Sequence, residues 1–127
     1  NKSIIGFMLS IKPIYEINSF NMKLVRLCIK NLNIMKNYVK EVHKGRKILI
    51  NFLKKRNIEV IGKYSNTVLF ELESFIKVKK VTKYLLKKKF IVRPMLIDNN
   101  NKYIRATLGG SKIMKKFISK LDKALKI

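Results

Sequence analysis

The fold is decided by the stretch Tyr103-Ile104-Arg105-Ala106-Thr107-Leu108-Gly109-Gly110. Its β-branched, aromatic and apolar residues predict a strand that stops at the two glycines. Arg105 stands inside that strand, although arginine accounts for only five of the 30 basic residues in the chain. A guanidinium holds a carboxylate or phosphate by two parallel hydrogen bonds, which the ammonium of lysine cannot do. We therefore expect Arg105 to anchor an anionic group.

The segments on either side of this strand carry clear signals of their own. Ser111 is expected to cap a last helix, whose apolar stripe continues to the end of the chain. On the other side, residues 98–102 form a polar loop, and Phe90-Ile91-Val92-Arg93 reads as a strand ended by Pro94. The stretch 90–110 thus predicts two strands followed by a helix.

Further upstream, the apolar period switches between the helical and the extended pattern. It predicts a helix over 75–88, strands over 58–61 and 67–72, and a long helix from 19 to about 55 that bends or splits within 31–37. The resulting order is α-β-β-α-β-β-α. This order predicts an α+β fold in which helices pack on a small mixed or antiparallel sheet.

The N-terminal segment has a different pattern. Residues 4–9 are apolar on both faces, as in a short buried strand, and Pro13 favours an extended or turn conformation over 12–16. The chain opens at Asn1 without a methionine, inside this pattern. We therefore expect it to be a fragment of a longer protein.

The amino-acid composition limits the kinds of protein and of partner that this chain can represent. A chain of 127 residues with 47% hydrophobic residues can build one core, and its net charge of +23 would suit nucleic acid or an anionic surface. The basic residues are mostly lysines, however, and they are spread over every segment. We keep a basic nucleic-acid or anionic-surface binding module as the alternative function and expect nucleic acid not to be the main partner.

The remaining sequence features mainly argue against other kinds of site. The single cysteine, Cys28, fits a reducing, cytoplasmic setting and is expected in a helix core. No apolar run is long enough to cross a bilayer. No spacing of metal ligands and no phosphate loop occurs, and His43 lies among charged neighbours, as on a surface.

Several short motifs in this order resemble the C-terminal part of histidinol-phosphate-type aminotransferases, which are class I/II, fold-type I, pyridoxal-phosphate enzymes. The motifs cover nearly the whole chain. They are Ile5–Phe7, Tyr15–Ser19, Asn66–Phe70, Phe90–Pro94 and Ile104–Gly109.

The resemblance implies that residues 1–17 are a remnant of the large pyridoxal-phosphate-binding domain, with one strand and a connector. Residues 18–127 would be the C-terminal small domain with its long interdomain helix at the start. It also implies a cytoplasmic homodimer in amino-acid biosynthesis. The reaction would move an amino group between an anionic amino donor, a phosphate ester or an amino acid, and a 2-oxo acid.

The resemblance also suggests roles for three residues. Arg105 would hold the anionic end of the substrate, Arg93 would assist it, and Asn66 would lie near the substrate. Alternatives stay open at each position. Arg105 could pair with Glu71 or Glu73, Arg93 could be merely solvated, and Asn66 could be a turn residue that bonds its own backbone.

The chain departs from the family pattern in ways that limit its chemistry. Ile4 occupies the position of an arginine that helps hold the cofactor phosphate, and Ser10 runs directly into a shortened connector. No lysine lies in the context of the family's Schiff-base lysine, which we expect upstream of Asn1. We therefore assign no catalytic residue here and expect the cofactor to be bound mainly by an upstream part. The sequence leaves open whether the enzyme is truncated, split or decayed, and which donor and acceptor it uses.

Overall fold

The computed structural model describes residues 2–11, 17–62, 64–97 and 99–127, with the side chain of residue 101 left aside. The chain divides into two compact units, Asn1–Met35 and Lys36–Ile127. The predicted turn around Pro13, including Tyr15, lies outside the described residues. The predicted domain border at residue 17 stays a prediction.

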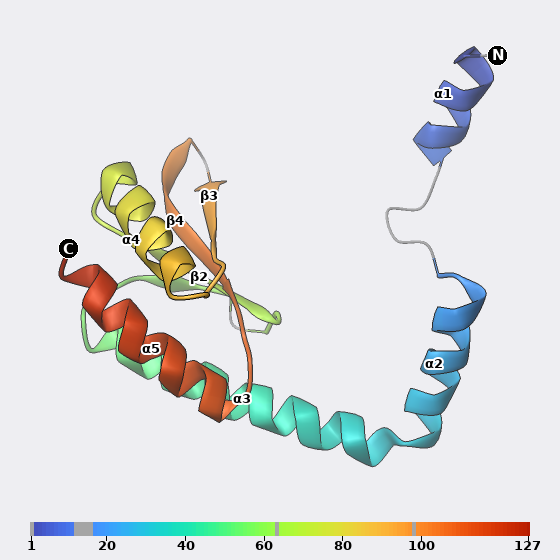
Figure 1. Ribbon diagram of the computed structural model, residues 1–127, viewed down its shortest axis with the longest axis horizontal. Coiled ribbons are helices and arrows are strands. Elements are labelled where there is room, and N and C mark those ends of the chain that lie inside the picture. Colours follow the sequence, from blue (N-terminus) through green and yellow to red (C-terminus); the bar gives the residue numbers. More distant parts are fainter. Residues whose placement is uncertain (1, 12–16, 63, 98) are drawn as a thin grey trace. The chain divides into compact units, whose positions relative to one another are not determined.

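The larger unit is built on a four-stranded antiparallel sheet with the strand order β1-β2-β4-β3. Figure 1 labels β2, β3 and β4 of this sheet. The strands are β1 (Val60–Ile61), β2 (Thr67–Glu71), β3 (Arg93–Ile97) and β4 (Asn100–Thr107). Three helices accompany them, namely α3 (Leu32–Lys54), which belongs to this unit from Lys36 on, α4 (Phe75–Lys87) and α5 (Ser111–Leu125). This arrangement confirms the predicted α+β class.

The core lies between the helices and one face of the sheet. Alternate residues of the two central strands are buried, as the pleat of a half-covered sheet requires. The fully or nearly fully buried residues include Val68 and Phe70 on β2, Ile104 and Ala106 on β4, Leu49 and Leu53 on α3, Val78, Val81 and Leu85 on α4, and Met114, Phe117 and Leu121 on α5. The intervening strand residues therefore lie on the opposite face, which these helices leave uncovered, although Tyr103 there is only 9% exposed.

The long helix splits where the sequence predicts. Asn18 caps α2 (Ser19–Lys30) by accepting a hydrogen bond of 2.8 Å from the backbone of Asn21. Asn31 then separates α2 from α3, and its side-chain amide donates to the carbonyl of Leu27 at 2.9 Å. Asparagine bonds the backbone locally in this way and weakens a helix interior.

The predicted strand over residues 4–9 is wrong, because Lys2–Ile11 forms the helix α1, which has no buried residue. A short apolar run does not distinguish a buried strand from a helix by its period. None of the described strands pairs with this segment. A helix satisfies the backbone within the segment itself, whereas a strand requires a neighbour.

The third strand also differs from the prediction, because it begins at Arg93 and continues through Pro94 instead of ending there. Pro94 is tolerated because β3 is the edge of the sheet, where one side of the strand needs no donor. Phe90 packs its ring against Phe117, with 5.5 Å between the ring centroids. The predicted loop over 98–102 is shorter than expected, since β4 already begins at Asn100.

Two smaller expectations are corrected as well. The N-cap of α5 is Gly110, and Ser111 is the first helical residue. Cys28 is exposed, since α2 has no buried residue, so it is not part of a core.

Within the described residues, no helix combines the length and the apolar character that crossing a membrane requires.

Candidate anion site

Arg93 and Arg105 lie directly opposite each other on neighbouring strands. In the register of β3 with β4, Arg93 pairs with Arg105, and on its other side Arg105 pairs with Leu69 of β2. Paired residues of an antiparallel ladder have their Cα atoms about 4.5–5.5 Å apart and their side chains on the same face. The structure therefore brings two of the three predicted site residues together.

The pair lies on the face of the sheet opposite the core. Ile104 and Ala106, which flank Arg105, are buried under the helices, so Arg105 points the other way. Arg105 is half-buried and Arg93 is exposed. The two guanidinium groups are thus accessible from the uncovered side.

No carboxylate neutralises this pair within the part of the chain that the structure describes. Glu71, one alternative partner of Arg105, accepts hydrogen bonds from Asn100 at 3.0 Å and from Tyr103 at 3.5 Å instead. Glu73, the other alternative, is exposed and makes no ion pair among those residues. Like charges directly opposite each other destabilise a sheet. An oxyanion between the two guanidinium groups would remove that cost.

Asn66 lies just before β2, near the end of β4. Its backbone carbonyl accepts a hydrogen bond of 2.9 Å from the amide of Leu108. Its exposed side chain makes no hydrogen bond with the described residues, so the alternative of a turn asparagine bonding its own backbone is not observed. Asn66 lines a different cavity from the surface that carries the arginine pair.

That cavity has a volume of about 320 Å³ and lies between α3 and the sheet end where β2 begins and β4 stops. Its lining includes Tyr38, Tyr64 and Asn66 together with Thr107. Thr107 is two residues beyond Arg105, so the cavity begins about 7 Å along the strand from the arginine. Sequence patterns did not single out the two tyrosines or Thr107, because residues from three separate segments meet here only after folding.

The closeness of α3 to the start of α5 depends on Gly45, which belongs to none of the sequence motifs. A Cβ atom at Gly45 would overlap the carbonyl oxygen of Gly109 and lie 2.9 Å from Cγ of Met114.

On the same helix, Glu41 accepts a hydrogen bond of 2.9 Å from the hydroxyl of Ser111. Lys44 and then Ser111 hold the pKa of Glu41 below its usual range by hydrogen bonding to its carboxylate.

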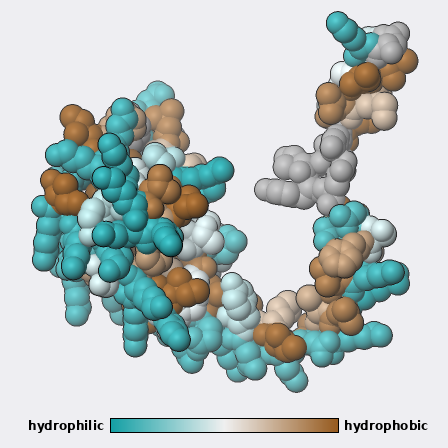
Figure 2. Space-filling model, in the orientation of Figure 1, coloured by the Kyte–Doolittle hydropathy of each residue, from teal (hydrophilic) through white to brown (hydrophobic). Residues whose placement is uncertain are grey.

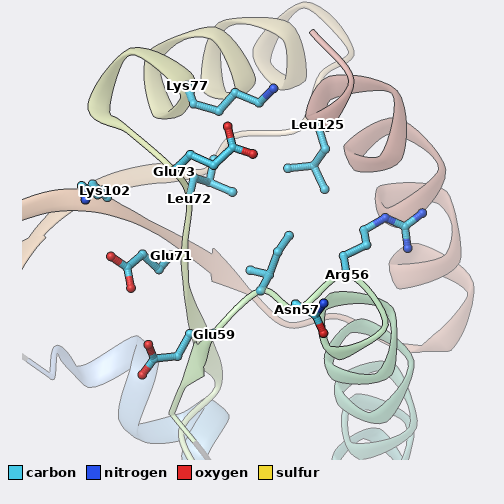
Figure 3. Close-up of a pocket in the computed structure, with 10 residues that line it drawn as sticks. Arg56, Asn57, Glu59, Glu71, Leu72, Glu73, Lys77, Lys102 and Leu125 are labelled. Atoms are coloured by element: carbon cyan, nitrogen blue, oxygen red, sulfur yellow. The ribbon is translucent and has the colours of Figure 1, made fainter.

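A larger cavity, about 590 Å³, lies elsewhere, and its lining of three basic and three acidic side chains offers an anionic substrate no net positive charge (Figure 3). In Figure 3 the carboxylates of Glu59 and Glu71 point to the same side, while that of Glu73 lies on the side of Lys77. None of Arg93, Arg105 and Asn66 lines it. The lining residues are Arg56, Asn57, Ile58, Glu59, Glu71, Leu72, Glu73, Lys77, Lys102 and Leu125.

Other site types find no support in the described residues. His43 is exposed on α3, as the sequence predicted for a surface residue. No group of three or more His, Cys, Asp or Glu side chains in the described part of the chain could hold a metal ion.

Comparisons with known proteins agree with the motifs. No protein-family model matches the chain. The chain is 29% identical to histidinol-phosphate aminotransferase of Methanocaldococcus jannaschii, over 98% of this chain and 34% of that protein. It therefore spans about a third of the length of this curated relative.

Two solved structures share the fold. One is a provisionally named aminotransferase from Burkholderia pseudomallei, with a TM-score of 0.70 and 12% identity, covering 98% of this chain and 38% of that one. The other is a provisionally named histidinol-phosphate aminotransferase from Erwinia carotovora atroseptica, with a TM-score of 0.59 and 16% identity, covering 68% of this chain and 24% of that one. The resemblance to histidinol-phosphate aminotransferases that the motifs predict is thereby confirmed, and the fold is that of part of an aminotransferase.

Proposed function

We propose that this chain is the substrate-anchoring part of a pyridoxal-phosphate-dependent aminotransferase. In this proposal Arg105 and Arg93 bind the anionic group of an amino donor, either a phosphate ester or a carboxylate, while the amino group moves to a 2-oxo acid. Asn66 lies beside the bound substrate. The family resemblance further suggests a cytoplasmic homodimer that serves amino-acid biosynthesis.

The observation that carries the proposal is the register of Arg93 with Arg105. Two guanidinium groups that share one face of the sheet and have no counter-charge among the described residues form a ready site for a dianionic head group. Each fork offers two parallel donors, so the pair orients the anion as well as attracting it. The shared register also explains why this chain keeps arginine at two positions where lysine would satisfy a solvated strand.

The described residues do not fit the cofactor itself. Ile4, at the position of the family's phosphate-binding arginine, lies on the exposed helix α1, and the described lysines are all exposed or half-buried. A Schiff-base lysine needs a desolvated setting to lower its pKa. We therefore derive no step through the cofactor from this chain. Its contribution is to bind and orient the substrate.

Anion binding by the isolated chain tests the proposal directly. We expect the backbone amide NMR signals of β3 and β4 to shift saturably when glycerol phosphate or glutarate is added at constant ionic strength. Arg105→Ala should weaken this binding about tenfold or more, since charge-assisted hydrogen bonds are lost. Arg105→Lys should recover only part of it, because the ammonium lacks the fork geometry.

Arg26→Ala provides the matched control, since it removes the same charge from an exposed position on α2. Equal affinity of Arg105→Ala and Arg26→Ala would refute the anchoring role. A second test is to read the coding sequence upstream of Asn1. The absence of a Ser-Lys pair within about ten to fifteen residues, the family's distance, would contradict an active enzyme with the usual arrangement.

A further inference from the structure

Arg46 is the only charged residue that is buried among those the structure describes, with 8% of its surface exposed. It lies on α3 and donates a hydrogen bond to the carbonyl of Gly62. A guanidinium has five N–H donors, and among the described residues this is the one hydrogen bond that Arg46 makes. No carboxylate of the described residues pairs with Arg46. A buried charge without a counter-charge costs several kcal/mol, so a partner anion is expected.

Arg46 lines the cavity of about 320 Å³ described above. Several side chains with hydroxyl, amide or imidazole groups line the same space, and no carboxylate does. Those residues are Tyr38, His43, Tyr64, Ser65, Asn66 and Thr107. Small-molecule sites in proteins have volumes of roughly 300–1,000 Å³, with a few polar groups that converge on the ligand. The size and the donors of the cavity thus suit a small anion.

We propose that this cavity binds an oxyanion, a phosphate or carboxylate group, through Arg46. Neither Arg93 nor Arg105 lines this cavity, which Arg46 borders from α3, so the site is distinct from that pair. The inference rests on the burial and the missing counter-charge of Arg46, not on the proposed enzyme activity.

The test follows the Nε–Hε NMR signal of Arg46 in the unmodified chain. Inorganic phosphate is added at pH 7 while sodium chloride keeps the ionic strength constant, and Arg46→Lys identifies the signal. We expect the signal to shift saturably and to do so equally in the double variant Arg93→Ala/Arg105→Ala. Arg46→Met keeps an unbranched stem but removes the charge. Since this variant lacks the guanidinium signal, its binding is followed by the backbone amide signal of Asn66, which lines the cavity. Arg46→Met should weaken phosphate binding about tenfold or more.

The signal in the unmodified chain decides the matter even if Arg46→Met does not fold. A stationary Arg46 signal, while the amides of β3 and β4 respond, would overturn this inference and leave the proposed function intact. A shift that chloride alone reproduces would overturn it as well. Tighter binding of glycerol phosphate than of inorganic phosphate would identify the anion as part of a larger ligand, whereas equal binding would identify a free ion. Both of these results support the site.

Discussion

Gly45 shows how a single residue sets the approach of two elements. The residue is buried on α3, and a side chain there would overlap the carbonyl oxygen of Gly109 and crowd Met114. The backbone oxygen of Gly109 cannot move away cheaply, because the following helix is packed into the core. The absence of a side chain at Gly45 is therefore a condition of the fold, although glycine weakens a helix interior.

Gly45→Ala is expected to destabilise the chain by about 1–3 kcal/mol, the usual cost of overpacking a filled site. The urea unfolding midpoint, followed by near-ultraviolet circular dichroism, measures the loss. Gly6→Ala is the matched control, because nothing lies within 4 Å of a Cβ at that position. Gly6→Ala should leave the midpoint unchanged and raise helicity slightly. Similar midpoints for the two variants would contradict the packing account of Gly45.

The arginines show which part of a site can be predicted from sequence. Arg105 stood out because it interrupts an apolar strand in a chain that otherwise prefers lysine. Its pairing with Arg93 could not be derived from composition, since it depends on the register of β3 with β4. Arg46 was not singled out, because the charged residues near it on the same helix predict a side that faces solvent. Its burial is seen only in the fold, where its guanidinium donates to the carbonyl of Gly62, sixteen residues later.

At the scale of elements, the success of the sequence patterns depended on whether each segment carries its own partners. The strand at 67–72 and the helix at 75–88 were predicted closely, because each alternates between polar and buried positions and meets its neighbours within this chain. The segment 4–9 lacks a neighbouring strand among the described residues and became helical. Pro94 was misread as a terminator because edge position is a property of the sheet, not of the strand.

Glu41 links α3 to the first residue of α5, and this link should depend on pH. The pKa of Glu41 is lowered by hydrogen bonds from Lys44 and then from Ser111. The unfolded chain therefore binds the proton more readily than the folded chain does. The stabilisation is complete above the ordinary glutamate pKa of about 4.3 and is lost as the pH falls through the lower folded value.

Unfolding midpoints in urea between pH 3 and pH 7 test this linkage. We expect Glu41→Gln to be less stable than the original chain at pH 7 and the difference to shrink in acid. Glu73→Gln is the control, because Glu73 makes no ion pair among the described residues. A difference that stays constant with pH would mean that Glu41 acts through packing and not through its charge.

At the scale of the whole molecule, the charge of +23 calls for a separate explanation from the anion sites. Hydrophilic residues cover much of the visible surface of the larger unit, with apolar residues between them, and do not form one stripe (Figure 2). A distributed charge attracts any polyanion by releasing counterions, without a dedicated surface. Weak binding to nucleic acid would thus be a consequence of composition and would not make the chain a nucleic-acid reader.

Duplex DNA binding at several salt concentrations distinguishes non-specific attraction by the distributed charge from a dedicated nucleic-acid interface. The logarithm of the binding constant falls with the logarithm of the salt concentration by about 0.9 per phosphate contacted. If Arg93 and Arg105 formed a nucleic-acid interface, Arg93→Ala/Arg105→Ala would reduce this slope by about 1.8. We expect instead the same small change as for Arg26→Ala/Lys115→Ala, a control that removes two exposed charges from α2 and α5. A selective loss of slope in the Arg93 and Arg105 variant would favour the nucleic-acid module over the aminotransferase, because the same two forks would then be contacting phosphates of the duplex.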